Sequence, residues 1–209
     1  MDGALRPVYV AFEGTEGSGK STHAGRLAAT LGAVATQETG GTPIGQRLRA
    51  ILHDTAVDRL DDRAEALIIA ADRAQHFAEV IRPALAAGRS VVSDRSVYST
   101  LAYQGYGRGL DLAELRAIND WAMAGRWPDL VVFLDVTDQV AATRLAGRDL
   151  DRFERAGADF HRRVVDGFRA LAAEDPHRWI TIRPDGDKDA VADRIRHEVT
   201  ARLGAAVRP

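Results

Sequence analysis

Short apolar runs alternate with longer segments of helical spacing along the whole chain. Residues 8–13 and 130–134 are apolar almost throughout, which is typical of parallel strands buried on both faces. Weaker apolar runs predict three further strands, at residues 33–36, 90–93 and 179–182. Because strands and helices alternate, the pattern favours an α/β domain with a mainly parallel five-stranded sheet and helices on both faces.

Helical spacing fills the intervals between these strands. Gly32 marks the end of the first helix, and Pro43 is well placed in the first turn of the second. Pro83 lies inside the longest helical segment, where it predicts a kink or a restart. The predicted helices are residues 20–31, 43–53, 61–87, 111–124, 137–147, 158–173 and 187–203.

Composition and charge exclude several classes of function. Of the 209 residues 45% are hydrophobic, enough for a sizeable core, and the formal net charge is −2. Because nucleic-acid-binding proteins usually carry a basic field, no nucleic-acid partner is expected. The chain has no cysteine, which excludes disulfides, thiolate zinc sites and cysteine nucleophiles. No apolar run has membrane-spanning length and the N-terminus lacks a signal-peptide core, so we expect a cytoplasmic protein without membrane contact.

The segment after the first predicted strand matches the phosphate-binding pattern G-x-x-x-x-G-K-[ST]. Its glycines let backbone N–H groups turn inward around a polyphosphate, and the helix that follows adds a favourable dipole. Lys20, one of only two lysines in the chain, can reach the β- and γ-phosphates, and Ser21 can offer a hydroxyl to Mg²⁺. The loop by itself predicts only a bound nucleoside triphosphate, because GTPases, ATP-driven machines and small-molecule kinases share it. The expected binding residues are Gly14, Thr15, Glu16, Gly17, Ser18, Gly19, Lys20, Ser21 and Thr22.

Four further segments carry a specific order of charged and hydroxyl residues. They are 38–45 (ETGGTPIG), 70–76 (AADRAQH), 94–105 (DRSVYSTLAYQG) and 151–154 (DRFE). Together with the phosphate-binding loop they resemble segments of the bacterial thymidylate kinases, in that family's order and over about residues 8–173. The resemblance implies a P-loop nucleoside monophosphate kinase fold, with one domain over residues 1–209 and a short lid at about 144–156.

The resemblance implies a role for each matching residue on the acceptor side. Arg49 and Arg73 would bind the phosphate of the acceptor. Thr100 and Gln104 would hydrogen-bond the edge of the base. Tyr103 would pack against the sugar where a 2′-hydroxyl would lie, which favours deoxyribose. The implied substrate-binding residues are Glu38, Arg49, Ile69, Arg73, Arg95, Ser99, Thr100, Tyr103 and Gln104.

Catalytic and metal-binding groups are implied in the same way. Arg95 would lie between the donor and acceptor phosphates, and Asp94 would help Ser21 to hold Mg²⁺, directly or through water. Glu16 occupies a loop position where one branch of the family has arginine. Branches with an acidic residue there carry the transition-state arginine in the lid, which points to Arg148, with Arg144 and Arg152 as alternatives. The implied catalytic residues are Glu16, Lys20, Arg95, Arg148 and Arg152, and Arg144 would contact ATP.

The implied reaction transfers the γ-phosphoryl group of MgATP to dTMP, giving dTDP and ADP in dTTP biosynthesis. The acceptor is itself a phosphate with a second pKa of about 6, so it needs no general base at neutral pH. The chemical task is to bring two anions together in line and to exclude water. Several cations and a metal ion perform that task.

Four departures from the family pattern leave the acceptor open. Ile69 stands where the family usually has a phenylalanine that stacks on thymine, and Ser96 replaces the tyrosine or histidine of its Asp-Arg-(Tyr/His) signature. Gln37 and Thr39 replace an arginine and a proline. One alternative is therefore a kinase for another pyrimidine or a modified deoxynucleoside monophosphate. A second alternative is a P-loop regulatory NTPase without a small acceptor.

The family also forms homodimers through packed helices, which implies a homodimer here. In the long segment 61–87, Leu67, Ala71, Ala74 and Ala78 can form one stripe that would support such a contact. Trp121, near the end of a predicted helix, is expected in the core or in an interface.

Overall fold

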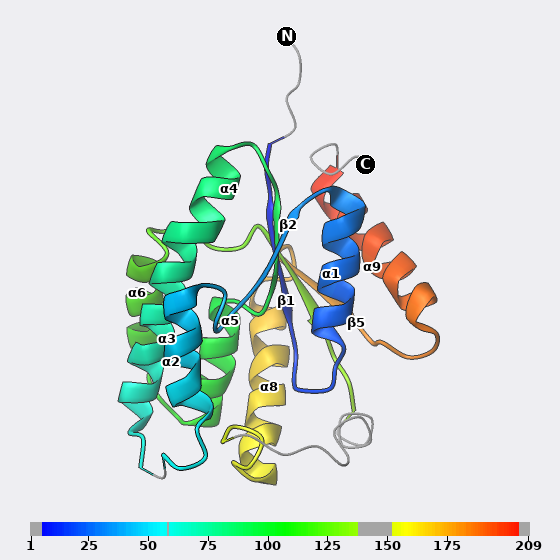
Figure 1. Cartoon of the computed structure of the whole chain (residues 1–209). Coiled ribbons are helices and arrows are strands. Elements are labelled where there is room, and N and C mark those ends of the chain that lie inside the picture. The colour runs from blue at the N-terminus through cyan, green and yellow to red at the C-terminus, as the bar shows by residue number, and fades with distance from the viewer. Residues whose placement is uncertain (1–5, 58, 138–151, 205–209) are drawn as a thin grey trace.

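Five parallel strands form the centre of the computed structural model, which describes residues 6–57, 59–137 and 152–204 (Figure 1). The strand order is β2-β3-β1-β4-β5, and every neighbouring pair is parallel. The predicted strands and the predicted parallel sheet are therefore confirmed, with bounds that differ by one residue at most. The strands are β1 (Tyr9–Glu13), β2 (Val34–Gln37), β3 (Val91–Asp94), β4 (Leu130–Leu134) and β5 (Trp179–Ile182).

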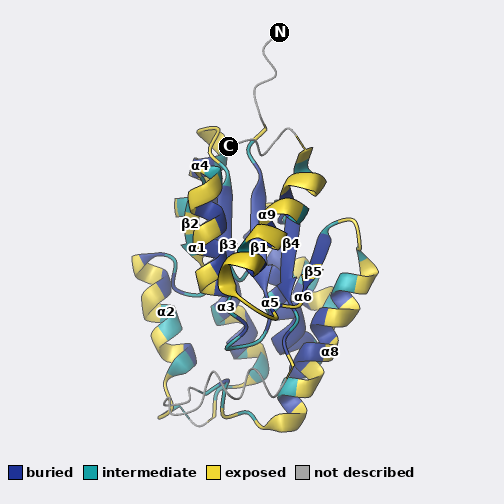
Figure 2. Cartoon of the chain, turned by 90° about the vertical axis from the view of Figure 1, so that its right-hand side faces the viewer, coloured by how far each residue is buried: buried dark blue, intermediate teal, exposed yellow. Residues whose placement is uncertain are grey.

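Helices cover both faces of this sheet. On one face α1 and α9 bury Phe12, Leu27 and Ile195 together, and on the other face α3, α8 and their neighbours bury Phe133 and Phe168. Each fully buried side chain of this kind contributes roughly 1.5–3 kcal/mol. Figure 2 shows the result, with buried strands enclosed by helices whose outer faces are exposed. The α-helices are α1 (Lys20–Leu31), α2 (Pro43–His53), α3 (Asp62–His76), α4 (Arg82–Ala86), α5 (Val97–Thr100), α6 (Leu112–Ala122), α8 (Ala158–Glu174) and α9 (Lys188–Leu203).

Two π-helical segments shape the helices on the acceptor side. The first, η1 (Phe77–Ile81), joins α3 to α4 and places Pro83 in the first turn of α4, so the predicted restart at this proline is confirmed. The second, η2 (Leu101–Gly107), continues α5. The sequence predicted no helix over 97–107, because its serines and glycines interrupt any apolar periodicity. Residues 138–147 of the predicted helix 137–147 lie outside the described residues, and Thr137 lies in neither a helix nor a strand.

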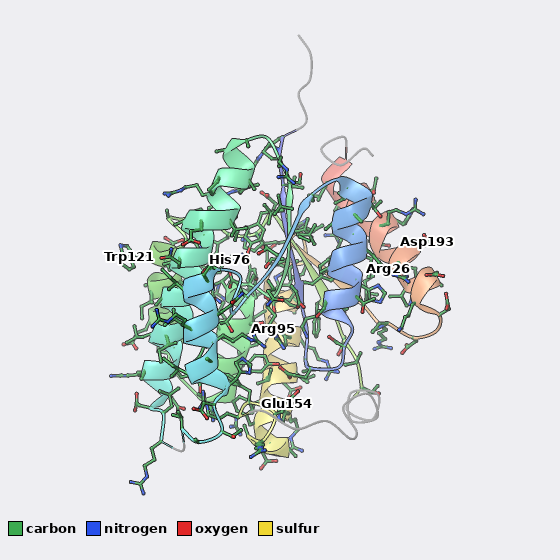
Figure 3. The ribbon with its side chains drawn as sticks, viewed as in Figure 1. Arg26, His76, Arg95, Trp121, Glu154 and Asp193 are labelled. Carbon is green, nitrogen blue, oxygen red and sulfur yellow. The ribbon has the colours of Figure 1, made fainter. Side chains whose placement is uncertain are left out.

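The predicted stripe is exposed at Leu67 and Ala71 of α3 and only partly exposed at Ala74 and Ala78. Leu67 is 55% exposed and Ala71 is also exposed, whereas Ile69 and Arg73 face the interior. Trp121 on α6 is 84% exposed and points away from the molecule in Figure 3, so it does not belong to the core of the single chain. Among the described residues no helix is both long and apolar enough to cross a membrane.

Candidate active site

A cleft opens where the carboxyl ends of the parallel strands meet, the usual place for ligands in open α/β sheets. The register pairs Phe12 of β1 with Asp94 of β3, so the loop after β1 and Arg95 after β3 lie at the same edge. The cleft has a volume of about 300 Å³. Figure 3 shows Arg95 between α2 and α1 at this edge. Residues predicted for both nucleotides line it, including Glu16, Lys20, Arg49, Ile69, Arg73, Arg95, Thr100, Tyr103 and Gln104.

The phosphate-binding loop has the local geometry that its glycines predict. At Gly14 φ is 143°, and an added Cβ would lie 2.8 Å from the carbonyl oxygen of Leu134, so only glycine fits. Lys20 is 7% exposed, and its Nζ donates to Thr15 O at 2.7 Å and to Ser18 Oγ at 3.3 Å. Burial, with added repulsion from Arg95, lowers the pKa of Lys20 to about 8. The ammonium group of Lys20 is thus bound to the loop itself, beside the space where phosphates would lie.

Ser21 and Asp94 form a site that suits a magnesium ion. Ser21 Oγ donates to Asp94 Oδ2 at 2.5 Å, and Asp94 Oδ1 is buried and has no hydrogen-bond partner among the described residues. Mg²⁺ prefers such oxygen ligands and completes its shell with phosphate oxygens and water. The described parts of the chain contain no group of three or more acidic or histidine side chains that could hold a metal ion by itself. Thr22, which was also predicted to bind the triphosphate, follows Ser21 in α1 and is exposed.

Arg95 connects the loop to the acceptor side. It has φ of 72°, a backbone conformation that is unusual for a residue with a side chain. Its Nη1 donates to Gly14 O at 3.2 Å and to Ser99 Oγ at 3.0 Å, and its Nη2 donates to Glu16 Oε1 at 2.6 Å. Burial alone would raise the pKa of Glu16, but Arg95 and Lys20 outweigh it, so this pKa is lowered.

Glu13, at the end of β1, binds Ser99, to which Arg95 also donates. It is 0% exposed, and its carboxylate accepts from Ser99 Oγ at 2.6 Å and from Ser96 Oγ at 2.7 Å. Burial raises the pKa of Glu13 to about 7. Sequence reasoning did not single out this residue. The signal was a carboxylate that ends an otherwise apolar strand directly before the phosphate loop.

Arg73 is the most enclosed of the predicted acceptor-side arginines. It is 1% exposed, and its Nε donates to Glu38 Oε2 at 2.8 Å. Its Nη1 donates to Thr100 Oγ1 at 3.0 Å and to Asn119 Oδ1. His76 Nδ1 lies 3.1 Å from Glu38 Oε1. Burial would raise the pKa of Glu38, but Arg73 and His76 outweigh it and lower this pKa. Asn119 and His76 were not assigned to the site from the sequence.

The remaining acceptor-side residues come from several elements. Arg49 of α2 donates from Nη1 to Thr39 O at 3.1 Å and lines the cleft beside Ile69 of α3. Tyr103 of η2 donates from its hydroxyl to Glu16 Oε1 and Oε2, both at 2.8 Å. Its ring makes edge contacts with aromatic side chains of the 153–168 region, namely Phe153, Phe160 and Phe168.

The predicted lid arginines are only partly described. Arg144 and Arg148 lie outside the described residues. Arg152 donates from Nη2 to Glu65 Oε2 at 2.5 Å and from Nε to Leu52 O at 2.9 Å. Its guanidinium is therefore bound on the acceptor side in this conformation.

The chain is similar to known proteins over most of its length. The family model described as Thymidylate kinase matches residues 12–195. A thymidylate kinase of Solidesulfovibrio magneticus is 49% identical over 90% of this chain and 96% of its own, and one of Desulfovibrio desulfuricans is 44% identical over 94% and 96%. The crystal structure of thymidylate kinase from Ehrlichia chaffeensis superposes with a TM-score of 0.77 at 30% identity, covering 92% of this chain and 98% of that one.

Proposed function

Because the chain belongs to the thymidylate kinase family and phosphorylates dTMP to dTDP with ATP, we propose that it uses MgATP and transfers the γ-phosphoryl group in line at the cleft described above. The observation that carries the proposal is the placement of Arg95. One guanidinium reaches the backbone of the phosphate loop at Gly14 and the hydroxyl of Ser99 on the acceptor side. Membership of this family overturns the alternative of a regulatory NTPase without an acceptor.

On the donor side, backbone N–H groups of residues 14–22 would surround the phosphates of ATP. Lys20 would leave Thr15 O and bind the β- and γ-phosphates. Ser21 and Asp94 would hold Mg²⁺, which is supported by the buried and unpartnered Asp94 Oδ1. When bound, the ion neutralises charge that develops on the phosphate oxygens.

Arg95 and a lid arginine would stabilise the transferring group. Arg95 lies at the junction of the two half-sites, and Glu16 holds it there. Arg148 is the proposed lid arginine, with Arg144 and Arg152 as the alternatives. Preorganised cations of this kind act where charge develops in the transition state.

On the acceptor side, Arg49 and Arg73 would bind the phosphate of dTMP, while Thr100 and Gln104 would face the base. Ile69 would cover the base by apolar contact, and Tyr103 would exclude a 2′-hydroxyl. Glu38 and Ser99 would act by holding Arg73 and Arg95 in place, which their hydrogen bonds support. A shift of base preference away from thymine remains the alternative that Ile69 motivates.

A coupled assay across monophosphates tests this proposal. With MgATP as donor, we expect kcat/KM to be highest for dTMP and lower for dUMP, dCMP and ribose UMP. Equal rates with dTMP and dCMP would reject the proposed base contacts. Activity that persists when EDTA removes divalent metal would reject the magnesium site.

We also propose that the protein is a cytoplasmic homodimer. The support for a dimer is a set of large apolar side chains on α2, α3 and α6 that the described part of the single chain leaves exposed. It consists of Ile44 (50% exposed), Ile51 (45%), Leu67 (55%) and Trp121 (84%). Sedimentation of the purified chain at micromolar concentration is expected to give a dimer, and a monomer would contradict the proposal.

A further inference from the structure

The amide of Gln104 has a defined orientation in the cleft. Gln104 is 1% exposed, lines the cleft, and donates from Nε2 to Glu65 Oε1 at 2.7 Å. An ionised carboxylate can only accept hydrogen bonds, so the NH₂ group of the amide must face Glu65. Its oxygen, Oε1, is then on the other side, and the side-chain hydrogen bond that this amide makes within the described part of the chain uses Nε2.

Two arginines also contact the carboxyl group of Glu65. It is 0% exposed in the first turn of α3. Arg108 Nη2 lies 3.2 Å and Arg152 Nη2 lies 2.5 Å from the Oε2 atom of Glu65. Each arginine has a second anchor, since Arg108 lies 4.7 Å from the ring centroid of Phe160 and Arg152 donates to Leu52 O at 2.9 Å. Guanidinium groups can only donate hydrogen bonds, so both contacts use the carboxyl group of Glu65 as the acceptor.

We propose that Glu65 is a positioning residue that sets base selectivity through the amide of Gln104. By holding Nε2, it presents Oε1 as a hydrogen-bond acceptor to the ring edge of the bound base. Thymine and uracil carry a donor, N3–H, at that edge, whereas cytosine carries an acceptor nitrogen. A pyrimidine with a ring N–H is therefore accepted and cytosine is rejected, because two acceptors would face each other.

The inference rests on the proposed function, in which Gln104 faces the base. It assigns Glu65 a role without contact to the substrate. It also explains why the buried Glu65 contacts the amide of Gln104. A neutral partner, such as another amide, would permit both orientations of the Gln104 amide. Sites that are built to hydrogen-bond a substrate discriminate through the penalty of an unpaired buried group.

The test compares Glu65→Gln with the wild-type chain on dTMP and dCMP. The amide that this substitution introduces can either accept or donate a hydrogen bond, so the amide of Gln104 can turn. We expect the ratio of kcat/KM for dTMP to kcat/KM for dCMP to fall about tenfold, mainly through KM. The exposed Glu114 offers a matched control, and Glu114→Gln is expected to leave the ratio unchanged.

The outcomes separate the inference from the function on which it rests. If Glu65→Gln lowers both kcat/KM values equally, Glu65 is only structural and the inference is wrong. If the wild-type chain does not prefer dTMP to dCMP, the proposed base contacts fail first. Should Glu65→Gln not fold, Glu65→Asp keeps a charge for Arg108 and Arg152 but shortens the reach to Gln104. It must then lower the ratio, and an unchanged ratio overturns the inference.

Discussion

The donor and acceptor sides of the cleft hold their positive charges in opposite ways. Lys20 in the phosphate loop hydrogen-bonds a backbone carbonyl and a hydroxyl, and no ion pair to it occurs among the described residues. Arg73 on the acceptor side is paired with Glu38, and Arg152 is paired with Glu65. Lys20, the proposed phosphate-binding cation of the donor side, is therefore held by neutral groups, whereas Arg73 and Arg152 are each paired with a protein carboxylate.

This difference separates ligand binding from stability. A buried ion pair contributes most when one partner is lost, because the other charge stays buried without compensation. Lys20 makes no such ion pair among the described residues, and its lowered pKa, caused by burial and by Arg95, indicates that its charge is poorly stabilised before a ligand arrives. On the proposed acceptor side, stability should therefore depend more strongly on the ion pairs than it does on the proposed donor side.

The largest expected effect comes from Arg73→Met. Loss of the guanidinium leaves the carboxylate of Glu38 buried beside an apolar group, so we expect the free energy of unfolding to fall by about 3–5 kcal/mol. The matched donor-side change, Lys20→Met, is expected to leave stability within about 1 kcal/mol but to lower kcat by at least about 100-fold. Urea unfolding and steady-state kinetics measure the two quantities.

A second change tests the cause of that loss. Adding Glu38→Gln to Arg73→Met removes the uncompensated charge, so the double variant should recover part of the stability. Strict additivity of the two single changes would contradict the ion-pair explanation. Equal destabilisation by Lys20→Met and Arg73→Met would remove the contrast between the two sides.

Two buried carboxylates, Glu13 and Glu38, are expected to change the free energy of unfolding with pH in opposite directions. The pKa of Glu13 is raised from 4.5 to about 7, so between these values the folded state binds more protons than the unfolded state. Its contribution is fully present below about pH 4.5 and is lost as the pH rises through 7, by about 3 kcal/mol at most. Glu38 has a lowered pKa, so its contribution is present above pH 4.5 and is lost as the pH falls.

Unfolding in urea from about pH 2 to about pH 8 measures both slopes. Glu13→Gln should remove the decline between about pH 4.5 and 7, and Glu38→Gln should change the slope only at the acidic end. If the free energy of unfolding of Glu13→Gln still declines by the same amount as the pH rises, the decline belongs to another titrating group.

The two sides also differ in how far the sequence predicts them. The phosphate loop consists of consecutive residues between a strand and a helix, so its pattern alone identifies it. The acceptor side joins residues far apart: Arg73 bonds Asn119, which is 46 positions away, and Gln104 bonds Glu65, which is 39 positions away. No local spacing marks Asn119 or Glu65, because each acts through another side chain. His76 ends the matching segment 70–76, but the segment does not show that this histidine contacts Glu38. The strands were predictable because burial on both faces makes them continuous apolar runs, whereas the helical segment at 97–107 has no such run.

The smallest expected effect concerns the wall of the cleft at Ile69. This residue is 7% exposed, lines the cleft, and lies one helical turn before Arg73 on the same face of α3. Ile69→Phe would add an aromatic face against the base, which is worth about 1 kcal/mol, so KM for dTMP should fall about fivefold while KM for ATP stays unchanged. Ile69→Leu keeps the apolar contact without the ring and serves as the control. If both variants lower KM equally, apolar contact alone covers the base. If neither variant lowers KM, Ile69 packs in the wall of the cleft and does not contact the base.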